Sequence, residues 1–179
     1  TPYKTFPNSL VQIQDQGGLI SLNVISRPLL TAFLEKCGVP ADKTGPLLDA
    51  LEDYTDTDHL TRINGAERET YAQNGKKGPR NSPLLSVPEL WSVWGWDAYR
   101  ATLEKNDCAA QFTTYGEASL GGARVNAATA PAPVLKAMGL NDEAVQDILT
   151  ARGDLEAVAA RAAQNTGSVL SGTAYSLKS

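Results

Sequence analysis

The spacing of apolar residues changes along the chain, from a strand-like period of two to a helical period and back. Residues 10–15 and 19–22 alternate apolar and polar positions, with two glycines between them. This pattern predicts two short strands or one bent hairpin. Residues 173–177 alternate again, which predicts a terminal strand.

Between these segments the apolar residues recur every three to four positions, which predicts helices. One helix begins near Pro28 and stops at Gly38, and a second runs from Leu47 toward Tyr54. Residues 55–82 are polar and rich in Gly, Asn and Lys, which predicts a long irregular loop. Further helices are predicted to start at a Ser86–Glu89 capping box, at Trp96, at Ala132, at Ala144 and at Leu155. The order favours an α+β fold with a helical insertion.

The sequence also repeats itself. Residues 22–39 match residues 125–140: Asn23 corresponds to Asn126, Ser26 to Thr129, and Gly38 to Gly139. A third, fainter copy covers residues 81–96. We expect the two asparagines to play equivalent parts, the hydroxyl side chains to cap helices, and each glycine to reverse the chain between two short helices.

Such helical hairpins resemble helix-hairpin-helix and SAM-like units, some of which hold DNA phosphate on their backbone amides. A helix-hairpin-helix DNA-binding protein is therefore the alternative function. Against it, Asp42, Asp142 and Glu143 lie at the turns, where carboxylates repel phosphate. The whole chain also carries 16 basic and 20 acidic residues, a net charge of −4, which does not favour nucleic acid as a partner.

The chain has no apolar run of about 18 residues that could cross a membrane, and its start lacks the pattern of a signal peptide. Because it begins at Thr1 without Met, this is weak evidence about an anchor. Cys37 and Cys108 are the only cysteines, and the sequence leaves open whether they form a disulfide or two separate buried thiols. The single His59 argues against a Cys/His zinc site.

Four carboxylates concentrate around the polar loop: Asp53, Asp56, Asp58 and Glu67. Oxygen clusters of this kind suit Ca²⁺, so we predict a possible Ca²⁺ site there; a solvated acidic loop is the alternative. An EF-hand is excluded, because Leu60 and Thr61 occupy the positions of a ligand and of the required glycine. An enzyme using Glu67 and Glu69 as acid and base would need both in one substrate-sized pocket.

Five segments, taken in order, resemble the general secretion pathway protein K family, the large minor pseudopilin of bacterial type II secretion. They are DQGGLISLN (15–23), LLDALEDYTDTD (47–58), GAERETY (65–71), RNSPLLSVPEL (80–90) and RVNAATAP (124–131). The sequence departs from the family pattern at Glu52-Asp53-Tyr54, where an Asp-Trp pair is common, and at Ala127, where Asn is usual.

The resemblance implies a small pilin-like antiparallel sheet that carries a large inserted helical domain of SAM-like, helical-hairpin units. We accordingly predict core strands in residues 1–22, the inserted helical domain in 23–110, and a second hairpin repeat with the return to the core in 111–179. The resemblance also implies a non-enzymatic role, and metal binding is familiar in that family. The resemblance further implies hetero-oligomers with other minor pseudopilins at the filament tip, in the periplasm, anchored to the inner membrane by an N-terminal helix absent from this chain.

Overall fold

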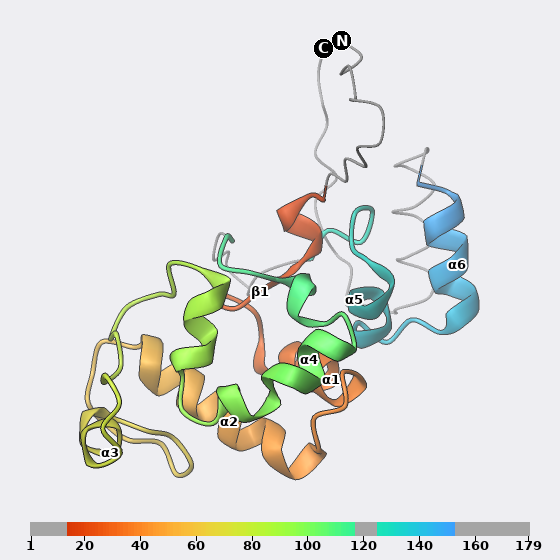
Figure 1. The fold of residues 1–179 in the computed structure, drawn as a ribbon. Coiled ribbons are helices and arrows are strands. Elements are labelled where there is room, and N and C mark those ends of the chain that lie inside the picture. The colour runs from red at the N-terminus through yellow and green to blue at the C-terminus, as the bar shows by residue number, and fades with distance from the viewer. Residues whose placement is uncertain (1–13, 117–124, 153–179) are drawn as a thin grey trace, which may run out of the picture.

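The computed structural model describes residues 14–116 and 125–152 of the chain. These residues form mainly short helices around one small sheet (Figure 1). In chain order the elements, with η denoting a 3₁₀ helix, are η1 (Gln16–Gly18), β1 (Ile20–Ser21), α1 (Arg27–Lys36), α2 (Ala41–Thr55), α3 (Arg68–Gln73), η2 (Val87–Ser92), η3 (Trp96–Tyr99), α4 (Arg100–Lys105), η4 (Ala109–Gln111), β2 (Phe112–Thr113), α5 (Ala132–Ala137) and α6 (Asp142–Thr150).

Two helical hairpins, α1–α2 and α5–α6, correspond to the two sequence repeats. Within each hairpin the two helices pack together, and α1 of the first also packs against α5 of the second. The first helix of each hairpin buries apolar side chains on one side: Leu30, Phe33 and Leu34 in α1, and Val134 and Leu135 in α5. The repeated segments therefore meet through their first helices.

Both hairpins reverse the chain with the same backbone turn. Gly38 and Gly139 have φ of 91° and 93°, a left-handed conformation that glycine adopts without a steric penalty. In each turn the residue after the glycine donates its N–H to the carbonyl oxygen five positions earlier, that of Leu34 or Leu135. The predicted repeat is confirmed at this end of the two segments.

The beginnings of the two repeats differ, contrary to expectation. The Asn23 side chain bonds the carbonyl oxygens of Leu84 and Thr114, 61 and 91 residues away. The Asn126 side chain instead donates to the Asp15 carboxylate at 3.2 Å, 111 residues away, and its oxygen accepts a local bond from the Ala128 N–H. The two asparagines therefore join different parts of the chain: Asn23 connects to residues 84 and 114, and Asn126 connects to Asp15.

The predicted hydroxyl caps are also wrong. Ser26 precedes α1, but its side chain accepts no capping bond, and Thr129 bonds Asp15 instead of a helix amide. Proline in the first turn of α1 and of α5 removes one amide that would otherwise need a partner. The hydroxyl groups are therefore not needed at these two positions.

The sheet differs from the predicted one within the described residues. β1 and β2 form a parallel pair, with Ile20 opposite Phe112 and Ser21 opposite Thr113, whereas the resemblance implied an antiparallel sheet. The chain leaves β1, builds the helical segment and returns in the same direction, and a long crossover of this kind permits parallel pairing. The strand predicted at 10–15 lies mostly outside the described residues, and its last two residues, 14 and 15, are not in a strand. The strand predicted at 173–177 and the helix predicted near 155–163 lie outside the described residues.

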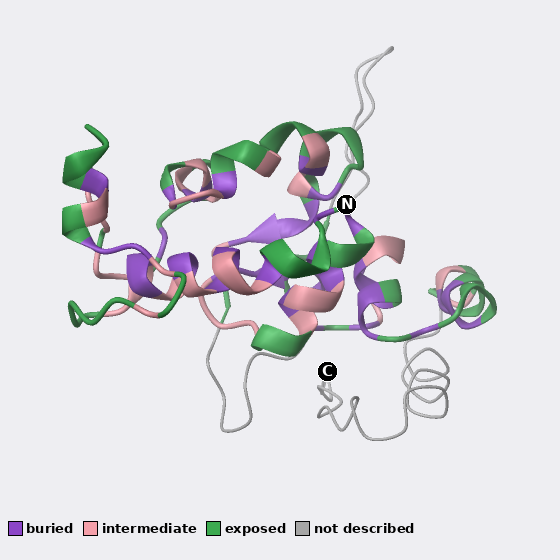
Figure 2. Ribbon diagram, turned by 90° about the horizontal axis from the view of Figure 1, so that it is seen from below, coloured by how far each residue is buried: buried purple, intermediate pink, exposed green. Residues whose placement is uncertain are grey.

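One continuous core joins the first hairpin, the sheet, the 3₁₀ segments and the second hairpin, and Figure 2 shows the buried positions in purple. Trp96 is fully buried and donates its indole N–H to the Leu47 carbonyl oxygen at 2.8 Å. Its ring packs edge-on against the Phe112 ring, and the Phe33 ring also packs edge-on against Phe112. Trp96 is thus a core residue.

Two local predictions need correction. Residues 55–82 contain the short helix α3, which buries Tyr71, so this segment is not entirely irregular. The Ser86 side chain forms no cap, and Glu89 reaches back to the Leu85 N–H instead, at 2.9 Å. The turn there is a 3₁₀ helix, whose tighter winding shifts the predicted capping contact by one residue.

Candidate functional site

The segments that resemble the secretion family contact one another in space. Asp15, in the first segment, accepts bonds from the Thr129 hydroxyl at 2.8 Å and from the Asn126 amide at 3.2 Å, both in the last. Bonds from the Gly17 backbone and from Thr129 lower the Asp15 pKa. A Cβ on Gly18 would lie 2.7 Å from the Ala130 nitrogen. These residues form a joint between distant parts of the chain, and they offer no reactive group.

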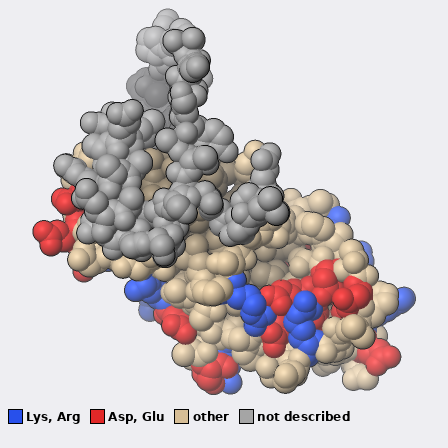
Figure 3. Space-filling view, turned by 180° about the vertical axis from the view of Figure 1, so that it is seen from behind, with Lys and Arg blue, Asp and Glu red and all other residues tan. Residues whose placement is uncertain are grey.

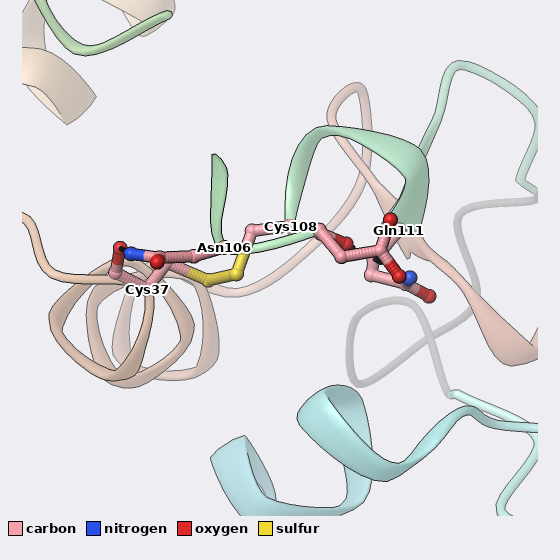
Figure 4. Close-up of a disulfide and its surroundings, with 5 residues drawn as sticks. Cys37, Asn106, Cys108 and Gln111 are labelled. Carbon is pink, nitrogen blue, oxygen red and sulfur yellow. Dashed lines mark hydrogen bonds between the residues drawn. A yellow bond between two sulfur atoms is a disulfide. The ribbon is translucent and has the colours of Figure 1, made fainter. Parts of the chain in front are cut away.

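A disulfide fastens the end of the first hairpin helix to the segment after α4 (Figure 4). Cys37 and Cys108 are bonded, 71 residues apart. The Asn106 side chain, from the same segment, donates to the Cys37 carbonyl oxygen at 2.7 Å. The question that the sequence left open is therefore settled in favour of a disulfide, which closes much of the helical segment into a loop.

The predicted acidic cluster is built around Arg62. The Asp53 side chain is fully buried at the end of α2, and its carboxylate lies 2.6 Å from the Arg62 guanidinium. The same guanidinium nitrogen lies 2.6 Å from an oxygen of Asp56. Bonds to Asp56 and Asp53 raise the Arg62 pKa. Two of the four predicted ligands thus converge, but on an arginine.

The ion pairs continue outward along α2. Arg62 also pairs with Glu52 at 2.8 Å, and Glu52 pairs with Arg27 at 2.7 Å. Arg27 reaches Asp49 at 2.8 Å. The sequence analysis missed both arginines and these two carboxylates. The presence of Arg62 inside the acidic loop was the available signal, because a cation among several carboxylates is the simplest way to neutralise them.

The other two predicted ligands lie apart from this pair. Glu67 is buried, and neither of its carboxylate oxygens has a hydrogen-bond partner in the described residues. Burial raises the Glu67 pKa, and the nearby Asp53 and Asp56 carboxylates raise it further. Asp58 is exposed and accepts a bond from the Leu60 N–H at 2.7 Å. The structure therefore does not bring all four carboxylates together.

The arrangement fits a metal ion only in part. Among the residues the structure describes, no three acidic, Cys or His side chains are grouped closely enough to hold an ion. The Arg62 guanidinium takes the position between Asp53 and Asp56. One oxygen of Asp56 and both oxygens of Glu67 are nevertheless buried without partners, an arrangement that costs free energy unless a cation or donor joins it.

The carboxylates considered for catalysis share neither of two surface hollows of the described residues. The larger, of about 220 Å³, is lined by Lys36, Cys37, Asn106, Ala132, Pro133 and Lys136. The smaller, of about 100 Å³, includes Glu52 alone among acidic residues. Glu67 and Glu69 line neither hollow, so these hollows give no support to the acid–base reading.

The hairpin turns carry acidic side chains where DNA phosphate would bind. Asp42 lies in the first turn of α2, and Asp142 and Glu143 lie in the first turn of α6. The Ala144 amide of α6 is already bonded to the Asn141 side chain. On the face shown in Figure 3, acidic and basic side chains gather together, without a broad basic patch. No evidence favours the DNA-binding alternative.

None of the helices in residues 14–116 and 125–152 combines the length and the apolar character needed to cross a bilayer. No curated protein sequence matches the chain. The chain is similar to a solved structure, the crystal structure of the GspK-GspI-GspJ complex from the enterotoxigenic Escherichia coli Type 2 Secretion System. The TM-score is 0.58 with 18% identity, over 86% of this chain and 61% of that chain. This similarity establishes a shared fold, and our chain spans about 61% of the solved one.

The family model of type II secretion system (T2SS) protein K matches residues 8–107, which is more than half of the 179 residues. The match covers the disulfide's first cysteine, the acidic cluster and four of the five segments that the sequence analysis singled out. The chain therefore belongs to the type II secretion system protein K family.

Proposed function

We propose that this chain is part of a non-enzymatic minor pseudopilin that assembles with other minor pseudopilins at the tip of the type II secretion pseudopilus. In that role it supports protein secretion across the outer membrane. The observation that carries the proposal is the family match over residues 8–107. A fold shared with a chain of the GspK-GspI-GspJ complex supports it.

The proposed location is the periplasm, with the full-length protein tethered to the inner membrane by the N-terminal helix of the family. The Cys37–Cys108 disulfide supports this location, because structural disulfides persist in oxidising compartments such as the periplasm. The proposed inserted domain, residues 23–110, is supported by the sheet: β1 ends at Ser21 and β2 begins at Phe112. Because β1 and β2 pair, the two ends of the segment between them lie side by side in the sheet.

Co-purification tests the proposed function. The chain would be expressed in the periplasm together with the soluble parts of the I and J minor pseudopilins from the same organism. We expect a stable hetero-oligomer on size exclusion, and we expect the full-length gene to restore secretion in a strain that lacks it. Absence of both the complex and the restored secretion would contradict the proposal.

We also propose that Ca²⁺ binds in the acidic cluster, where it competes with Arg62 for Asp53 and Asp56 and also engages Glu67. The support is the unpartnered, buried oxygens of Asp56 and Glu67 and the preference of Ca²⁺ for carboxylate oxygens. Asp58, the fourth predicted ligand, would have to release the Leu60 N–H to join. A melting temperature measured in chelator and in Ca²⁺ tests this proposal, with Asp58→Asn as a further variant.

A further inference from the structure

We draw no further inference here: the strongest candidate, the surface hollow of about 220 Å³ between α1 and α5 that Lys36, Asn106 and Lys136 border, carries nothing, because Lys136 already pairs with Asp142 and nothing in the described part of the structure shows what covers the hollow.

Discussion

The two helical hairpins share one backbone turn but are fastened to the molecule in different ways. Hairpin α1–α2 is covalently linked by Cys37–Cys108 and carries the network of ion pairs around Arg62. Hairpin α5–α6 has one exposed ion pair, between Lys136 and Asp142, and one side-chain cap, at Asn141. It is also held by apolar packing, chiefly of α5 on α1, and by the bonds from Asn126 and Thr129, just before α5, to Asp15.

The comparison shows that each hairpin forms from residues close together in the sequence, whereas its attachment to the rest of the molecule depends on residues far apart in the sequence. The glycine turn and the helices depend on residues within a few positions of one another. The disulfide and the ion pairs connect residues that are 6 to 71 positions apart. Substitutions in the first hairpin should therefore affect long-range connections, whereas substitutions in the second should affect local ones.

The largest effect is expected from loss of the disulfide. Replacing Cys37 and Cys108 together by Ser removes a link across 71 residues, which should lower the free energy of unfolding by about 4 kcal/mol in the chain-entropy model. Urea unfolding with and without reductant measures it. The double variant should be insensitive to reductant, and a wild-type chain equally insensitive would contradict the prediction.

The next effect concerns Arg62. Arg62→Ala leaves the buried Asp53 without its charged partner and should lower the free energy of unfolding by about 2 kcal/mol. Arg27→Ala, which breaks more exposed pairs, is the matched control and should cost less than about 1 kcal/mol. Because Arg62 would no longer compete, Ca²⁺ should raise the melting temperature of Arg62→Ala more than that of the wild type. Equal responses would count against the proposed competition.

Substitution of the two turn glycines compares the hairpins directly. Gly38→Ala and Gly139→Ala both place a side chain at positive φ, at a cost of about 1–2 kcal/mol each. At Gly38 a Cβ would also lie 3.2 Å from the Asn106 side chain, whereas at Gly139 no atom lies within 4 Å. Thermal unfolding should therefore show the larger loss for Gly38→Ala. The reverse order would show that the second hairpin is the more tightly held.

A smaller difference is expected at the helix starts. Asn141→Ala removes the side-chain oxygen that accepts the Ala144 N–H at the start of α6. It should lower the free energy of unfolding by about 1 kcal/mol. Ser26→Ala, at the start of α1, removes no capping bond and should change the free energy of unfolding by less than about 0.5 kcal/mol. Similar losses for the two variants would mean that Ser26 does cap α1 in solution.

The smallest effect should be the pH dependence of Glu67. Burial and the carboxylates of Asp53 and Asp56 raise its pKa in the folded state, so the ionised form opposes folding above the ordinary glutamate pKa. Glu67→Gln should therefore stabilise the protein at neutral pH in chelator, and the gain should disappear as pH falls through the raised pKa. Denaturation series at several pH values measure this. A loss of stability at neutral pH would show that the carboxylate has a partner.

The candidate site was only partly predictable. The concentration of carboxylates led to the prediction that Asp53, Asp56, Asp58 and Glu67 bind Ca²⁺, but only Asp53 and Asp56 converge, on Arg62. The sequence analysis chose Ca²⁺ and overlooked Arg62, although it lies nine residues from Asp53. Sequence alone could not decide this, because a loop can turn such an arginine inward or into solvent. Only the packed position of Asp53 makes an internal partner necessary.

The sequence by itself determined the helical hairpins, their glycine turns and the order of segments that marks the family. These features depend on apolar periodicity and on the left-handed conformation of Gly38 and Gly139, which are local properties. Only the tertiary structure decided the disulfide, the parallel pairing of β1 with β2 and the contacts of Asn23. Each joins residues 61 to 92 positions apart. Such pairs form only when the packing of whole helices brings distant segments together, and no local pattern specifies that.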